Sequence, residues 1–117
     1  MHPLDNRFQG VYRTALNSPT GLSDHSNADV AIDQFLSAIR AGKISMSADM
    51  ERTGSSIFLQ PPMVQHFSAS VDHFEQAGLD LQGYVLFSDR TWLAKAVDER
   101  ALASSEYDAM VATENAR

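Results

Sequence analysis

The chain has 117 residues, a formal net charge of −6, 44% hydrophobic residues and no cysteine. This length suits one domain, and the ordinary hydrophobic content excludes a chain that is disordered throughout. Without cysteine there can be no disulfide bond, thiolate metal site or cysteine nucleophile. The first ten residues lack the charge and apolar pattern of a secretory signal, and no apolar run approaches a membrane span of about 20 residues. We therefore expect a cytoplasmic protein that makes no membrane contact.

The first third of the chain predicts one short and one longer helix. An N-terminal extension over residues 1–26 holds a short helix over 8–16, followed by a polar loop. The longer helix is predicted over 28–41, capped by Ser26 or Asn27 and closed by Gly42. Its apolar stripe consists of Ala28, Ile32, Phe35, Leu36 and Ile39.

The middle of the chain predicts a turn, a strand and the start of a second helix. Residues 44–48 alternate in polarity, which suggests a short extended segment. Gly54 can take the positive φ of a hairpin turn, and the run 57–59 has the β-branched and aromatic composition of a core strand. Two prolines end this strand, and the second suits the first turn of a helix that closes at Gly78. The buried face of that helix is predicted to be Val64, Phe67, Val71 and Phe74.

The last third predicts a second strand and a third helix. Residues 79–88 are interpreted as a buried strand with Gly83 at a bulge. Asp89 then caps a helix over 90–98, for which a β-hairpin with the preceding strand is the alternative. Trp92, Leu93 and Ala96 are expected to point inward. The acidic tail over 104–117 is either frayed or a partner-binding segment. These elements together predict an α+β fold with a short antiparallel sheet.

The sequence predicts no catalytic site, metal site or cofactor. His66 and His73 are seven residues apart on one predicted helix, about 10 Å of rise, so they cannot share one metal ion. We expect both to flank the buried face and to turn their polar edges outward. Asp72 and Glu75 are interpreted as a solvated face. Because the chain has no glycine-rich phosphate loop and no nucleophile elbow, we expect a protein that is not an enzyme.

Two kinds of binding function remain open. Residues 61–117 hold four basic and nine acidic side chains, which argues against phosphate binding by this half. Cations nevertheless lie at the end of the first long helix, at the predicted hairpin turn and at the start of the last helix. One hypothesis is therefore contact with DNA or a protein partner through Arg40, Lys43, Arg52, Thr53, Gln65 and Arg90. Ordinary surface solubility explains the same cations. The alternative is an acidic interaction or inhibitor domain that offers a basic partner a face made of Asp98, Glu99, Glu106 and Asp108.

Three segments in order resemble the C-terminal domain of TraI-type conjugative relaxases and helicases. They are FLSAIRAGKI, SSIFLQPPMVQHF and LQGYVLFSDRTWL, and the likeness spans about residues 28–95. The residues that match the family pattern are Ile57, Phe58, Leu59, Pro61, Val64, Phe67, Gly83, Tyr84 and Leu86. The resemblance implies a small, helix-rich, winged-helix-like core over 27–103. It also implies a non-enzymatic accessory module of conjugative or mobile-element DNA processing, whose partner is DNA or a protein of the conjugation machinery.

The chain departs from the chemistry of a recognition helix. Such a helix offers Arg, Asn or Gln to base edges, and Gln65 is the one such residue near the start of the predicted second helix. The acidic balance of the chain departs from it as well.

Overall fold

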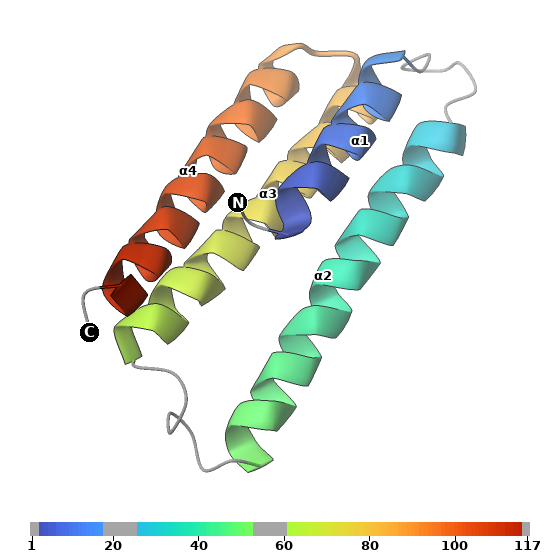
Figure 1. Cartoon of the computed structure of the whole chain (residues 1–117). Helices are drawn as coiled ribbons and strands as arrows, with labels where there is room; N and C mark the ends of the chain where they lie inside the picture. The colour runs from blue at the N-terminus through green and yellow to red at the C-terminus, as the bar shows by residue number, and fades with distance from the viewer. Residues whose placement is uncertain (1–2, 18–25, 53–60, 116–117) are drawn as a thin grey trace.

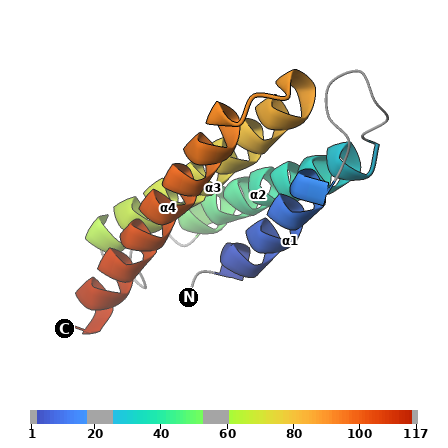
Figure 2. The same ribbon diagram turned by 90° about the horizontal axis from the view of Figure 1, so that it is seen from above.

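The protein is a bundle of four α-helices. The computed structural model describes residues 3–17, 26–52 and 61–115, with side chains described over 4–17, 26–43 and 65–112. The helices are α1 (Pro3–Asn17), α2 (Ser26–Arg52), α3 (Pro61–Phe87) and α4 (Thr91–Asn115). Successive helices run in opposite directions, and α1 lies in front of α3 between α2 and α4 (Figure 1). Figure 2 shows the four helices following one long axis, with α1 at the side of the bundle next to α2.

The core forms where α1, α2 and α3 meet. Phe8 of α1 is 2% exposed, and its ring centroid lies 6.0 Å from that of Phe35 on α2 and 6.2 Å from that of Phe74 on α3. The stripe predicted for the first long helix is confirmed, because all five of its side chains are buried. Val71 and Phe74 of the second predicted stripe are buried as well.

The most extensive helix contact joins α3 to α4. Both helices carry small, fully buried side chains, which suit a close approach of two backbones; they are Ser70 and Ala77 of α3 and Ala96 and Ala103 of α4. The hydroxyl of Ser70 donates a hydrogen bond of 2.7 Å to the carbonyl oxygen of Ala103. Since this hydroxyl is buried, the bond also avoids the free-energy cost of a buried polar group without a hydrogen-bond partner.

The predicted α+β fold with a winged-helix-like core is wrong. Every described residue outside 88–90 is helical, and no strand occurs in this part of the chain. The predicted extended segment 44–48 lies inside α2, and the predicted strand 79–88 is mostly the last part of α3. The predicted hairpin turn and the strand 57–59 lie outside the described residues. A winged helix needs a sheet, so this fold class does not apply.

Two glycines predicted to end helices do not end them. Gly42 lies within α2 and Gly78 within α3. A single glycine costs a helix about 1 kcal/mol relative to alanine, which tertiary packing can offset. A Cβ at position 78 would lie 2.9 Å from a methyl group of Leu36 and 3.1 Å from the ring of Phe35. Gly78 therefore permits the close approach of α2 and α3.

The turn between α3 and α4 confirms the predicted cap at Asp89. The backbone N–H of Thr91 donates to the Asp89 carboxylate at 2.9 Å, as expected for an N-cap residue. Ser88 takes a positive φ of 57°, and its N–H donates to the carbonyl oxygen of Tyr84 at 2.8 Å. This left-handed residue ends α3. The predicted helix over 90–98 exists, but α4 continues to Asn115.

In the described part of the chain, no helix has a stretch apolar enough to cross a bilayer.

Candidate functional site

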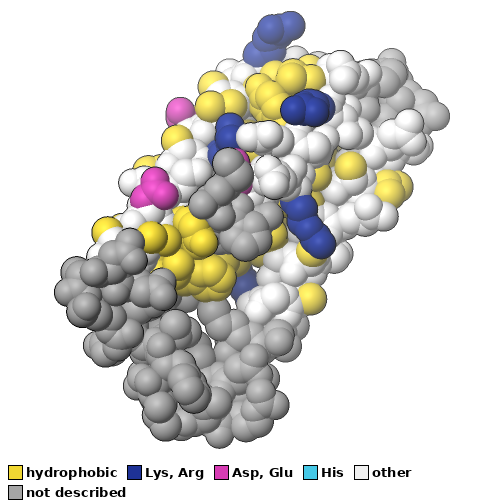
Figure 3. Space-filling model, viewed as in Figure 1, with side chains coloured by type: hydrophobic (Ala, Val, Ile, Leu, Met, Phe, Trp, Pro, Cys, Tyr) yellow, Lys and Arg dark blue, Asp and Glu magenta, His cyan; other side chains and the backbone are white. Residues whose placement is uncertain are grey.

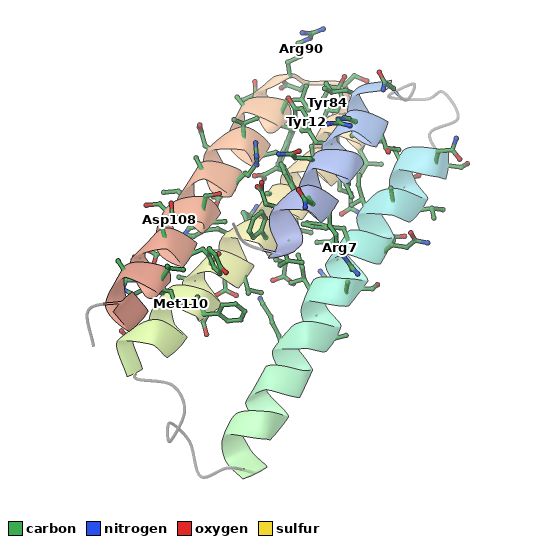
Figure 4. All side chains as sticks on the ribbon, viewed as in Figure 1. Arg7, Tyr12, Tyr84, Arg90, Asp108 and Met110 are labelled. Carbon is green, nitrogen blue, oxygen red and sulfur yellow. The ribbon has the colours of Figure 1, made fainter. Side chains whose placement is uncertain are left out.

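Exposed cations gather on the side of the molecule that carries α1. Arg7 and Arg13 occupy exposed positions on α1, and Arg90 extends from the turn between α3 and α4 (Figure 4). Figure 3 views this side and shows several dark-blue side chains with little magenta. We call the surface defined by Arg7, Arg13 and Arg90 the α1 face. Exposed positive charge attracts and orients negatively charged partners.

An apolar groove of about 240 Å³ runs between α1 and α4 on the α1 face. Leu16 of α1 is 43% exposed and Val97 of α4 is 45% exposed, and both line this groove. Two arginines line the groove, and no carboxylate is among the described residues that do so. The lining residues are Phe8, Gln9, Tyr12, Arg13, Leu16, Val97 and Arg100. We call it the α1–α4 groove.

A second groove of about 500 Å³ lies between α1 and α2. Small side chains shape it on both sides, with Gly10 on α1 and Ala31 on α2. Arg7 and Gln34 make its lining more polar than that of the α1–α4 groove. Grooves therefore flank α1 on both sides, each with an exposed arginine.

An ion pair between a buried carboxylate and a partly exposed arginine joins α1 to α4. Asp5 is 3% exposed, and its carboxylate accepts hydrogen bonds from Nε and Nη2 of Arg100 at 2.7 and 3.1 Å. This two-point geometry is the strongest form of an arginine–carboxylate contact. The hydrogen bond to Asp5 raises the pKa of Arg100, against the opposing effect of partial burial. The ion pair holds one end of the α1–α4 groove in place.

Arg40 and Lys43 use their charges within the molecule. Arg40 contacts Glu75 on α3 at 3.1 Å, and the Lys43 amine contacts Asp72 at 2.5 Å and Glu75 at 2.8 Å. The hydrogen bond from Lys43 lowers the pKa of Glu75 despite partial burial, with a further contribution from Arg40. Partial burial by itself lowers the pKa of Lys43. The hydrogen bonds to Asp72 and Glu75 outweigh this effect, so the pKa of Lys43 is raised. These two predicted contact residues therefore join α2 to α3.

The other predicted contact residues do not form one site. Gln65 is exposed near the start of α3, whereas Arg90 is exposed just beyond its opposite end. The 22 residues of α3 that follow Gln65 correspond to about 33 Å of helix. Arg52 is the last residue of α2, and Thr53 lies outside the described residues.

The acidic residues of α4 are divided between two sides of the helix. Glu99 and Glu106 turn toward α3, where they contact His73 at 2.6 Å and His66 at 2.7 Å. Asp98 and Asp108 are exposed. Adjacent residues on a helix are 100° apart, so Asp98 and Glu99 point in different directions.

The two histidines of α3 turn their polar edges to α4, and each contacts a different glutamate. Among the described residues, no three potential ligands are placed to hold a metal ion.

Asp80 is the second buried carboxylate. It is 3% exposed, and Nε2 of Gln76 donates to its Oδ1 at 3.1 Å. Burial raises the pKa of Asp80, and the nearby Glu99 carboxylate adds to this effect, whereas Gln76 and Lys95 oppose it. Asp80 lies at the packed α3–α4 contact, so its chemistry concerns stability rather than binding.

The sequence analysis missed Arg7, Arg13 and the two grooves. The signal was present, because Arg7, Gly10 and Arg13 follow one another at steps of three on a helix whose other side carries Phe8 and Tyr12. Residues 1–26 were interpreted as an extension, so the arginines were not weighed as part of a surface. The grooves depend on how α1 packs, which no local pattern specifies.

No protein-family model matches the chain. Neither the curated proteins nor the solved structures provide a match.

Proposed function

We propose that this protein is a non-enzymatic interaction module that binds a negatively charged protein partner across the α1 face. The observation that carries the proposal is the combination of exposed arginines and exposed apolar side chains on one surface. Protein interfaces typically combine an apolar centre with arginine and aromatic anchors. Leu16 and Val97 supply apolar surface beside Arg13.

The remaining charges of the described chain favour this face over the others. Arg40 and Lys43 are engaged by carboxylates of α3, and Glu99 and Glu106 are engaged by histidines. The predicted basic contact surface and the predicted acidic face are therefore both partly engaged in contacts within the molecule. Arg7 and Arg13 project from α1 with high exposure, which leaves them accessible to a partner.

A charge-matched capture experiment tests the proposal. The tagged chain is used to capture proteins from its native cell extract, alongside a variant with Arg7→Gln and Arg13→Gln. A control variant with Ser37→Glu and Ala41→Glu makes the same change in net charge at exposed positions of α2. We expect the arginine variant to lose a protein that the wild type and the control both retain. Equal capture by all three proteins, or capture of none, would contradict the proposal.

DNA binding within conjugative or mobile-element processing is a second candidate. The same exposed arginines, Arg7, Arg13 and Arg90, favour it because each could contact a phosphate. The net charge of −6 and the ion pairs of Arg40 and Lys43 make it the weaker candidate. Titration of duplex and single-stranded DNA at low salt decides between the two. Binding that weakens steeply with salt and with the two Arg→Gln changes would favour DNA.

A further inference from the structure

We propose that the α1–α4 groove binds an amphipathic α-helix of a partner protein, with carboxylates flanking the helix's apolar stripe. This inference rests on the proposed interaction function and names its site and the chemistry of its partner. Helix-in-groove binding places an apolar stripe with spacing i, i+3, i+4 and i+7 against an apolar trough.

The walls of the groove have the shape that such a helix requires. Tyr12 and Leu16 are four residues apart on α1, so they form one ridge along that helix. Val97 faces them from α4 and is nearly half exposed. Two neighbouring antiparallel helices leave a trough between them into which the ridge of a third helix can pack.

The size of the groove argues against a small organic ligand. Pockets for such ligands usually have volumes of about 300–1,000 Å³ and enclose most of the ligand. The α1–α4 groove has about 240 Å³, and its lining residues Leu16 and Val97 are 43% and 45% exposed. A shallow apolar trough of this kind suits a few side chains of a larger partner.

The charged residues of the groove indicate which side chains should flank the apolar stripe of the partner helix. Arg13 lies at the rim in an exposed position, and Arg100 keeps 36% of its side chain exposed while it holds Asp5. Guanidinium groups bind carboxylates through paired hydrogen bonds, which Arg13 can offer to a glutamate of the partner. A helix flanked by lysine would meet like charge at the same place.

The groove is preformed on the α1 side. The Asp5–Arg100 ion pair and the packing of Phe8 against Phe35 and Phe74 hold α1 in place. A preorganised site loses little conformational entropy on binding, so a short helix can bind without refolding of the bundle. Leu16 and Val97 are then the apolar contacts, and Arg13 is the charged contact.

The test uses labelled peptides of about 14 residues, four helical turns, with leucines at i, i+3, i+4 and i+7. One panel carries glutamates beside the leucine stripe, and a matched panel carries lysines. Binding to the full chain is measured by fluorescence anisotropy and mapped by amide chemical shifts. We expect the best acidic peptides to bind at least about tenfold more tightly than their lysine counterparts, with shifts centred on Leu16 and Val97.

Matched variants locate the site. Leu16→Ser and Val97→Ser should each weaken the acidic peptides about tenfold, and Arg13→Gln about fivefold with a smaller dependence on salt. Val30→Ser, at an apolar side chain 54% exposed on α2, should leave binding unchanged. Thermal unfolding of each variant separates a binding defect from a folding defect.

Three outcomes would overturn the inference. The first is no preference for acidic peptides, and the second is chemical-shift changes centred outside the α1–α4 groove. The third is self-association of the chain that Leu16→Ser abolishes, because Leu16 lines the groove and the occupant would then be a second copy. If these tests fail while native capture still depends on Arg7 and Arg13, the proposed function stands and only the groove inference is wrong.

Discussion

The two buried carboxylates, Asp5 and Asp80, have opposite effects on the stability of this bundle. Asp5 forms two short hydrogen bonds with Arg100, and removal of that arginine would leave a buried charge without its main partner. Asp80 has a neutral amide, Gln76, as its hydrogen-bond partner and Glu99 as a like charge in its surroundings. At the scale of single residues, Asp5 therefore organises the α1–α4 contact, whereas ionised Asp80 opposes folding.

Asp80→Asn should stabilise the protein at neutral pH. The pKa of Asp80 is raised above its ordinary value of 3.8, so the unfolded chain releases this proton at a lower pH than the folded one. The contribution of Asp80 to the stability of the folded state is therefore fully present below the unfolded-state pKa, and it is lost as the pH rises through the folded-state pKa. Asparagine keeps the oxygen that accepts from Gln76 and removes the charge. We expect a gain on the order of 1 kcal/mol at pH 7.

The pH dependence of the gain provides the control for Asp80→Asn. Urea unfolding of wild type and variant is compared at pH 7 and near pH 4. The difference in the free energy of unfolding should shrink at the lower pH, because the raised pKa of Asp80 means that more of this carboxyl is protonated in the folded state than in the unfolded chain. An equal difference at both pH values would show that the charge of Asp80 is not the cause.

The helices show which elements can be predicted from sequence and which cannot. The stripe from Ala28 to Ile39 and the cap at Asp89 were predictable, because each depends on neighbours within a few residues. The end of α3 was not, since Gly83 continues the helix and Ser88, a residue that rarely adopts positive φ, ends it. Residues 79–88 also fit helical spacing through Leu81 and Val85, both fully buried. The apolar run suited a strand equally well until its packing partner was known.

The binding surface was less predictable than the helices. Arg40 and Lys43 are cations near a predicted loop, but their pairing with Glu75 depends on the contact between α2 and α3. The α1–α4 groove likewise brings residue 16 beside residue 97. Contacts between residues so far apart in the sequence leave no local pattern, so neither the loss of the predicted site nor the presence of the groove could be anticipated.

A pair of glycine substitutions tests the packing of α3 against α4. A Cβ at position 83 would lie 2.6 Å from ring atoms of Trp92, whereas a Cβ at position 10 would have no neighbour within 4 Å. Both positions are inside helices, where alanine is favoured over glycine by about 1 kcal/mol. We expect Gly10→Ala to raise the melting temperature by a few degrees. Gly83→Ala should lower it, because displacing the Trp92 ring costs about 1–3 kcal/mol.

Trp92 fluorescence distinguishes the two glycine variants further. In Gly83→Ala the indole must move, so its emission should shift, whereas Gly10→Ala should leave the spectrum unchanged. If both variants were stabilised and the spectra were identical, α3 and α4 would not approach as closely as the structure shows.

The whole molecule is an elongated bundle whose first helix is the shortest. The principal extents are 50 × 26 × 18 Å, and α1 has 15 residues against 25–27 in the other three helices. Even so, α1 places Phe8 between Phe35 and Phe74 and supplies one wall of both grooves. The interaction surface and the folding core therefore depend on the same helix.

Removal of α1 should disrupt the folding of the whole bundle. Without residues 1–17, the apolar faces around Phe35 and Phe74 lose their cover, and the chain should bind a hydrophobic dye and unfold with reduced cooperativity. Phe8→Ala, which keeps α1, should cost about 3–5 kcal/mol, a large part of the 5–15 kcal/mol typical of a domain. Chemical unfolding followed by circular dichroism measures both. A truncated chain with the stability and cooperativity of the full chain would instead mean that α1 is an attached binding element, and that α2, α3 and α4 form a folding unit alone.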